Sequence, residues 1–301
     1  MINRERSSVK KKLNLKNDII FKAFFGKKGN EKYLIDFLTG LLKIDIKEIE
    51  IKEEVNLLQL SNYEKGGRLD IQAKLNNGNI VNIEMQVRDE HNIIERSTIY
   101  ASKVVNKELK VGQSYIDTSK VIMVNILNFN IFEYEEYVSE TMLVLKNHRD
   151  HEVSDLIKYY YIELPKYRKT KTDMNDKLNQ WLAVIDDTDW GKIEMAEKKN
   201  EKIKSALDDM EYLTGDEALQ RLAELRESSE IDRGLAMSYA RKEGEKKGEE
   251  KGEKKAKIET AKKLLEKNVS IDIIVEATGL TKEEYKEKQR IKYFHFMWTN
   301  M

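Results

Sequence analysis

The segment RLDIQAKLNNGNIVNIEMQV constrains the fold more than any other stretch, because apolar and polar residues alternate on both sides of a central turn. This period of two predicts strands over residues 68–75 and 80–87. A two-residue loop would mix polar and apolar side chains on each face. A three-residue loop over 76–78, with Gly78 in the left-handed conformation, gives one wholly apolar face, so we expect this register. The apolar pairs are then Leu69–Met85, Ile71–Ile83 and Ala73–Val81.

The opposite face of this hairpin is polar, and the expected register pairs Asp70 with Glu84. Their Cβ atoms would lie roughly 5 Å apart, and two carboxylates placed directly opposite each other repel. A divalent cation such as Mg²⁺ is one compensator, since proteins hold it with one or two carboxylates. A solvated polar face in which Arg68 offsets both acids is the other. Spacing alone supports both interpretations.

Patterns on either side of the hairpin predict an α/β or α+β domain. Apolar residues at helical spacing indicate helices before and after it, and short apolar runs indicate further strands. The expected helices begin at Asn17 and cover 31–42 and 92–110. The further expected strands cover 120–127, 141–145 and 157–164.

Composition divides the chain into four parts. Residues 1–12 are basic, and 13–188 carry the helix and strand patterns of a folded domain. Residues 189–257 are rich in Lys and Glu with sparse apolar positions, which indicates extended helices. Residues 258–301 predict a small helical unit followed by an apolar tail.

The combination of Asp70 with Glu84-Met85-Gln86, preceded by NDIIFKAFF and followed by ERSTIYASKV, resembles the PD-(D/E)XK nuclease superfamily. It is most similar to the Rpn branch, the recombination-promoting nucleases and transposase-like proteins. The segments YIELPKYRKT, LNQWLAVI and EGEKKGEEKGEKKA are also similar to that branch, so the resemblance spans most of residues 14–260. It implies a restriction-endonuclease-like core over 13–188, a mixed sheet flanked by helices, followed by an extended helical C-terminal region.

The resemblance also implies a metal site. Asp70 and Glu84 match its two acids and would hold Mg²⁺, with Mn²⁺ as a substitute. The backbone carbonyl of Met85 would complete the set of metal ligands. Asp18, in the first expected helix, would match an additional acid that is often found there in this superfamily.

Gln86 stands where the wider superfamily has a lysine, although the Rpn branch commonly has a glutamine. An amide can orient a water molecule, but it can neither supply positive charge nor act as a base. Either the metal alone activates the water, or a nearby cation takes over. Arg68 lies opposite Gln86 in the expected register and is a candidate for that cation.

Arg96, Tyr100, Lys103 and Lys107 are spaced by four, three and four residues, so they share one face of the helix expected after the hairpin. One interpretation is a surface that binds the phosphate backbone beside the metal site. The other is a solvated helix face with Tyr100 packed edge-on. We assign Lys107 to the solvated face and the other three residues to substrate binding.

Gly244, Gly248 and Gly252 recur every four residues in EGEKKGEEKGEKKA. Each interior glycine costs a helix about 1 kcal/mol relative to alanine. Close packing against another copy of the chain would offset this cost and predicts a homo-oligomer. A partly helical, low-complexity linker is the other interpretation.

The chain has 54 Lys and Arg against 54 Asp and Glu, and no Cys. Neutrality argues against a protein that coats nucleic acid through bulk charge, although it permits local basic surfaces. The lack of Cys excludes disulfides and thiolate zinc sites. No run of 18 apolar residues is present, so we expect no membrane segment and a cytoplasmic protein.

From these residues and the resemblance we expect a Mg²⁺-dependent endodeoxyribonuclease with little sequence specificity. The resemblance links it to recombination or mobile elements. The alternative is a catalytically weak or inactive nuclease fold that binds nucleic acid or associates with itself. RNA is compatible with the same site as DNA, because the phosphodiester chemistry is shared.

Overall fold

The computed structural model of the chain describes residues 14–52, 71–109, 111–213 and 215–281. The chain divides into two compact units, Met1–Ile231 and Asp232–Met301. Part of the expected hairpin, Arg68, Leu69 and Asp70, lies outside the described residues.

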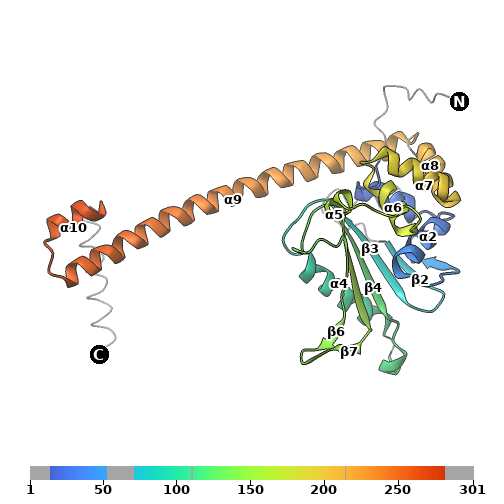
Figure 1. Cartoon of the computed structure of the whole chain (residues 1–301), viewed down its shortest axis with the longest axis horizontal. Helices are drawn as coiled ribbons and strands as arrows, with labels where there is room; N and C mark the ends of the chain where they lie inside the picture. The colour runs from blue at the N-terminus through green and yellow to red at the C-terminus, as the bar shows by residue number, and fades with distance from the viewer. Residues whose placement is uncertain (1–13, 53–70, 110, 214, 282–301) are drawn as a thin grey trace. The chain divides into compact units, whose positions relative to one another are not determined.

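A six-stranded mixed sheet forms the centre of the first unit, with the strand order β1-β2-β3-β4-β8-β5 (Figure 1). The pairs β3–β4 and β4–β8 are parallel, and the remaining pairs are antiparallel. The strands of this sheet are β1 (Ile49–Ile51), β2 (Ile71–Leu75), β3 (Ile80–Gln86), β4 (Val121–Leu127), β5 (Val138–Glu140) and β8 (Ile157–Glu163). A mixed sheet flanked by helices and followed by a long helix confirms the expected fold class.

The hairpin of β2 and β3 has the register expected from the sequence. Ile71 pairs with Ile83 and Ala73 with Val81. The three-residue loop is closed by hydrogen bonds from Leu75 N–H to the Asn79 carbonyl and from Gly78 N–H to the Leu75 carbonyl, and Gly78 has a φ of +86°. Since a side chain other than glycine is strained at such a φ, Gly78 fixes the loop and with it the faces of both strands.

Helices cover both faces of the sheet. α1 and α2 lie on the face that bears Val81 and Ile83, while α4 lies on the face that bears Ile80 and Met123. The helices of the first unit are α1 (Asp18–Phe25), α2 (Glu31–Leu42), α4 (Ile93–Glu108), the 3₁₀ turn η2 (Tyr115–Asp117), α5 (Leu164–Lys169), α6 (Lys177–Asp186), α7 (Trp190–Lys199), α8 (Glu201–Leu213) and the first turns of α9 (Glu217–Glu266). Asn17 caps α1 as expected, because its side chain accepts the backbone N–H groups of Ile19 and Ile20.

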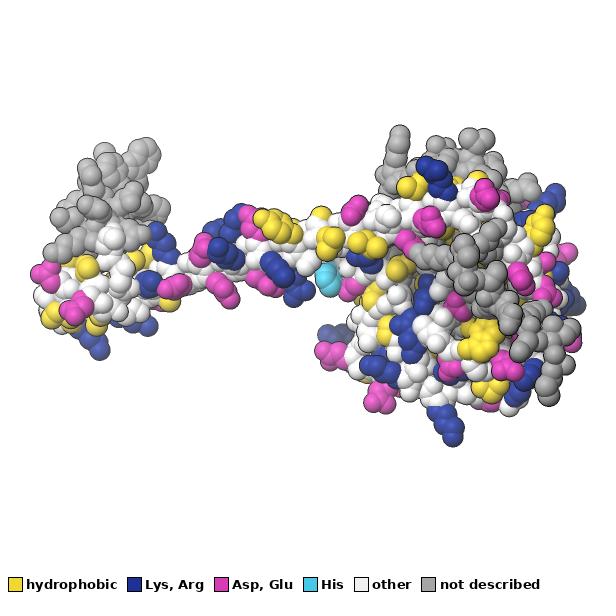
Figure 2. Space-filling model, turned by 90° about the horizontal axis from the view of Figure 1, so that it is seen from above, with side chains coloured by type: hydrophobic (Ala, Val, Ile, Leu, Met, Phe, Trp, Pro, Cys, Tyr) yellow, Lys and Arg dark blue, Asp and Glu magenta, His cyan; other side chains and the backbone are white. Residues whose placement is uncertain are grey.

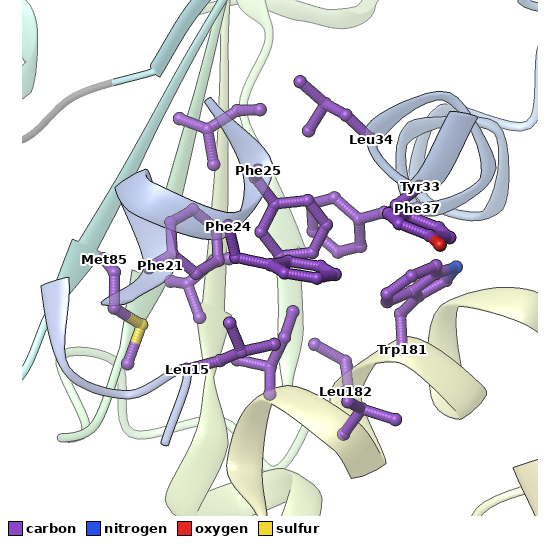
Figure 3. Close-up of a cluster of buried hydrophobic side chains, with 14 of the residues drawn as sticks. Leu15, Phe21, Phe24, Phe25, Tyr33, Leu34, Phe37, Met85, Trp181 and Leu182 are labelled. Atoms are coloured by element: carbon purple, nitrogen blue, oxygen red, sulfur yellow. The ribbon is translucent and has the colours of Figure 1, made fainter. Parts of the chain in front are cut away.

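Aromatic side chains fill the core between α1, α2 and α6 (Figure 3). The ring of Phe24 stacks on that of Tyr33 at 5.3 Å between centroids, and Phe25 lies 5.6 Å from Trp181. All four side chains are fully buried. Buried aromatic groups of this size dominate the apolar stabilisation of a core, so this cluster anchors α1 on the sheet.

The core of the first unit extends beyond residue 188, where the sequence places the end of the first domain. Helices α7 and α8 and the start of α9 each bury one stripe of apolar residues against it. The buried residues are Ile193, Ala196, Ile203, Ala206, Met210, Leu219 and Ala223. Their spacing is helical but sparse among Lys and Glu, which is why composition alone does not assign these helices to the folded domain.

The region 141–154 differs from the sequence expectation. The expected strand over 141–145 is shorter, β6 (Leu143–Leu145), and it pairs with β7 (His148–Ser154) in a separate two-stranded sheet. β7 is exposed along its whole length. It therefore lacks the alternation of buried and exposed positions from which a strand is recognised in a sequence.

The second unit contains the later part of α9 and α10 (Ile271–Thr278). Ala261, Ile274 and Leu280 form a small core, and Gly279 ends α10 with a φ of 65°. Acidic and basic side chains are intermingled along the exposed helix (Figure 2). Ion pairs join residues four apart, such as Lys247–Glu243 at 2.6 Å and Lys257–Glu253 at 2.7 Å. Within the described residues, none of the helices combines the length and apolar character that crossing a membrane requires.

Candidate active site

The α4-facing side of the sheet carries a buried polar corner at the end of β3. Side chains alternate along this strand, so Ile83 and Met85 enter the main core while Glu84 and Gln86 lie on the opposite face. Glu84 is buried, with 6 % of its surface exposed. A carboxylate at this depth requires compensating hydrogen bonds or charge.

Arg96 of α4 supplies part of that compensation. Its Nη2 donates to Glu84 Oε1 at 2.8 Å and also to Gln86 Oε1. Its Nη1 lies 3.3 Å from Glu90 Oε2. One guanidinium therefore joins the two motif side chains on β3 to an acid in the loop that follows the strand.

A second pair of residues fixes α4 on this corner. Asn125 of β4 lies directly beside Glu84 in the parallel register. Its Oδ1 accepts a hydrogen bond of 2.7 Å from Ser97, which is completely buried on α4. Because Ser97 is the neighbour of Arg96 in the chain, this bond holds the arginine over the end of β3.

Asp18 lies at the start of α1 and is bound by an arginine from far along the chain. Arg226 of α9 donates from Nε and Nη2 to Asp18 Oδ2, at 2.9 and 2.6 Å. The side chains of Asp18 and Arg226 are each 12 % exposed. This geometry is the fork of a guanidinium on a carboxylate, which is among the strongest polar contacts in proteins.

Further acids connect Arg226 to the β3 corner. Glu230 lies 3.5 Å from Arg226 and 3.9 Å from Arg88, which follows β3. Burial lowers the pKa of Arg226, but its bonds to Asp18 and the charges of Glu230 and Glu90 outweigh burial and raise the pKa overall. Since Glu90 also pairs with Arg96, a chain of alternating charges runs from Asp18 to Glu84.

Lys103 and Lys107, at the far end of the α4 stripe, are more exposed than Arg96. Tyr100 packs at the edge of the apolar cluster around Ala101. Lys103 is exposed, with its Nζ 5.0 Å from the centre of the Tyr100 ring, and Lys107 is also exposed. Arg96 therefore belongs to the interior of the site, whereas Lys103 lies where a ligand can reach it from solvent.

Within the described residues, the structure brings together Glu84, Gln86 and Arg96 from the expected site, and other charged side chains connect Asp18 to them. The side chain of Met85 enters the apolar core, which leaves its backbone carbonyl as the candidate ligand. Asp70 and Arg68 lie outside the described residues.

The donor chemistry of this corner suits a hard cation. A carboxylate, an amide oxygen and a backbone carbonyl are oxygen ligands of the kind that Mg²⁺ takes. Within the residues that the structure describes, no three acidic or histidine side chains come together as a metal site. The side-chain oxygens of Glu84 and Gln86 here hold the guanidinium of Arg96.

Sequence reasoning missed four polar residues of this region. Asn125 carries a recognisable signal, because it is the single polar residue in the apolar run VIMVNIL. Ser97 and Glu90 carry a weaker one, since Ser97 adjoins Arg96 on α4 and Glu90 lies in the loop before that helix. Arg226 carries none, because 208 positions separate it from Asp18.

Comparison with protein families matches residues 15–240 to the family described as PD-(D/E)XK nuclease family transposase. No curated protein and no solved structure matches the chain. The matched residues run from the start of α1 into α9, so they include Asp18, Glu84 and Arg226. With a match over most of its length and the expected mixed sheet at its centre, the chain belongs to the PD-(D/E)XK nuclease family.

Proposed function

We propose that this protein is a Mg²⁺-dependent endonuclease that hydrolyses DNA with little sequence specificity. The observation that carries the proposal is the hairpin register, which buries Glu84 at the polar corner of the sheet. Continuing that register by one residue would set Asp70 opposite Glu84. Two acids and a backbone carbonyl would then face one position.

In this proposal Glu84 and Asp70 hold the cation, together with the carbonyl oxygen of Met85. The cation, when bound, stabilises the negative charge that develops on the phosphate oxygens. Gln86 orients the attacking water through its amide, which requires that Arg96 release the amide oxygen. Arg96 is then placed to pair with the phosphate backbone, and Lys103 extends that contact on the exposed side of α4.

A plasmid assay tests this function. Supercoiled DNA is incubated with Mg²⁺ and wild-type protein, Glu84→Gln or Asp70→Asn. We expect each variant to cleave at least about a hundredfold more slowly, because the electrostatic effect of a metal ion is worth several kcal/mol. Glu50→Gln is the matched control, since Glu50 is an exposed acid on β1 of the same sheet. Equal cleavage by all four proteins would reject the site.

The ion pairs favour a second candidate, a nuclease fold that binds nucleic acid without cutting it. Glu84 and Asp18 are both neutralised by arginines of the same chain. In a binding protein these pairs would persist when nucleic acid binds. DNA retention in a gel-shift assay, with no cleavage and no change on Glu84→Gln, would support this candidate over the first.

We also propose that the family description, with its reference to transposases, reflects a role in recombination or mobile-element biology. RNA and DNA duplexes of matched sequence distinguish the substrates. Faster cleavage of the RNA would replace DNA in the proposal and leave the residues unchanged.

We propose in addition that α9 mediates self-association through its glycine stripe. A Cβ atom added at Gly244, Gly248 or Gly252 meets open space in the single chain. Alanine at all three positions should therefore stabilise an unpartnered helix but obstruct close packing of two copies. Light scattering should show a lower mass for this variant than for the Lys246→Ala control. An unchanged mass would reject the stripe as an interface.

A further inference from the structure

Both carboxylate oxygens of Asp18 accept hydrogen bonds from donors of the same chain. Its Oδ1 accepts the backbone N–H of Ile19 at 3.0 Å and Nε of Arg226 at 3.2 Å. Its Oδ2 accepts Nε and Nη2 of Arg226. These four contacts come from three N–H groups, because the single Nε–H of Arg226 is shared between the two oxygens. A divalent cation at Asp18 would therefore compete with the guanidinium of Arg226 for the same oxygens.

The part of α9 that carries Arg226 is anchored to the core of the first unit. Leu219 and Ala223, on the preceding turns of α9, are buried in the core of the first unit. The side chain of Asn17, the cap of α1, donates to the backbone oxygen of Ala223 at 3.0 Å. The cap of α1 and the start of α9 are thus bonded to each other beside the ion pair. Arg226 is therefore part of the architecture of the site and differs from a flexible surface arginine.

The pair also lies within the electrostatic reach of the β3 corner. Glu90 acts on Arg226 and forms an ion pair with Arg96, which in turn binds Glu84. A change in the charge at Asp18 therefore alters the electrostatic potential along the series of charged side chains that ends at Glu84. If one arginine of this series is removed, the remaining acids attract another cation.

We propose that Arg226 is a positioning residue of the candidate site, which holds Asp18 and competes with a divalent cation for its carboxylate. The proposal rests on the function proposed above and adds a residue from α9 to it. When a cation binds, Arg226 loses contacts to Asp18 while remaining anchored through α9. Its guanidinium is then available to the phosphate backbone of the nucleic acid, for which its planar fork is suited.

A Mn²⁺ titration of the full chain, followed by electron paramagnetic resonance, tests the competition without any cleavage step. Arg226→Gln should bind Mn²⁺ about tenfold more tightly than wild type, the size expected for losing a charged hydrogen-bonded partner. Arg226→Lys, which keeps the charge but not the fork, should lie between them. Arg221→Gln is the matched control, because it removes the same charge from an exposed position of α9.

The double variant Asp18→Asn, Arg226→Gln separates competition from a structural effect. The tighter binding should disappear in it, since the carboxylate that Arg226 releases is gone. Circular dichroism confirms folding, and Arg226→Lys carries the test if Arg226→Gln does not fold. Unchanged or weaker Mn²⁺ binding in Arg226→Gln and Arg226→Lys would overturn the proposal.

Glu84→Gln in the same titration reports on the proposed function separately. Loss of Mn²⁺ binding in Glu84→Gln, without tightening in Arg226→Gln, would retain the metal site and reject the role of Arg226. Tighter Mn²⁺ binding in Arg226→Gln that depends on Asp18, with normal Mn²⁺ binding in Glu84→Gln, would retain the role of Arg226 and reject the metal site at Glu84.

Discussion

Asp36 and Glu84 are both buried acids of the first unit, yet the chain holds them in different ways. Asp36 on α2 accepts hydrogen bonds from Trp181 at 3.0 Å, Asn200 at 2.7 Å and Lys177 at 2.9 Å. Two of these donors are neutral, Trp181 on α6 and Asn200 at the end of α7. Glu84 instead has a guanidinium partner that it shares with Gln86 and Glu90.

The difference separates an acid that stabilises the fold from one that can act in chemistry. Two neutral donors remain with Asp36 even if the half-exposed Lys177 moves away, so this acid keeps hydrogen-bond partners without a bound cation. A shared arginine neutralises Glu84 but can be replaced by another cation, because the replacement preserves the charge balance. Breaking the Asp36 cluster should therefore lower the stability of the protein, whereas breaking the Glu84 cluster should lower its activity.

The largest expected effect is on the activity of Glu84→Gln. Cleavage should fall at least about a hundredfold, while the free energy of unfolding changes by less than about 1 kcal/mol, since the amide still accepts from Arg96. Plasmid cleavage and urea unfolding of the same preparation measure both quantities. A large loss of stability with normal cleavage by the folded fraction would remove the distinction from Asp36.

Asp36→Asn should show the opposite behaviour. Removing the charge and one acceptor from a buried network should lower the free energy of unfolding by about 2 kcal/mol. Cleavage per folded molecule should stay within a few-fold of wild type. Lys177→Met is the matched control for a single lost donor, because its side chain is half exposed, and it should destabilise less than removal of the shared acid. A specific loss of cleavage in Asp36→Asn would show that its cluster is functional too.

The pH dependence of stability sharpens the same contrast at Asp36. Burial raises its pKa, but the hydrogen bonds from its three donors outweigh burial and hold the pKa below the ordinary value of 3.8. A carboxyl group whose pKa is lower in the folded than in the unfolded state stabilises the fold at pH values above its ordinary pKa. This stabilisation is lost as the pH falls through the folded-state pKa. Wild type and Asp36→Asn should therefore converge in stability below about pH 4. Parallel curves from pH 7 to pH 3 would exclude this role of the ionised carboxylate.

The smallest expected effect is that of Lys103→Ala, which tests whether Lys103 on α4 has a different role from Arg96. Lys103 is exposed and would contact only the phosphate backbone, so Lys103→Ala should reduce the salt dependence of DNA binding by about one ion, with cleavage at saturating DNA unchanged. Fluorescence anisotropy at several salt concentrations measures the slope. A loss of cleavage at saturating DNA would place Lys103 inside the reactive site instead.

The parts of the fold that could be predicted are those with a local signal. The hairpin register follows from Gly78 and the apolar pairs, and the end of α2 follows from its own apolar spacing. The pairing of Asp18 with Arg226 could not be predicted, because it depends on how α9 packs across α1. β7 was missed because it is exposed on both faces.

In the candidate site, too, the features with a local sequence signal could be predicted and those that depend on tertiary packing could not. The period of two puts Glu84 and Gln86 on one face of β3, as the structure has them, and helical spacing puts Arg96 on the α4 stripe without showing that it contacts them. The sequence assigned Arg96 to the phosphate backbone, whereas in the structure it binds the acids of the same chain. A charged side chain shows its partner only when the elements are assembled, so this arrangement requires the tertiary structure.

An anomalous-scattering map from crystals grown with Mn²⁺ tests the metal site most directly. We predict a peak at direct coordination distance from carboxylate oxygens of both Asp70 and Glu84, with Arg96 displaced from Glu84 Oε1. The peak should be absent from crystals of Glu84→Gln grown in the same way. A map of the wild-type protein with no peak beside Glu84, and Arg96 still bound to it at saturating Mn²⁺, would contradict the proposed nuclease site.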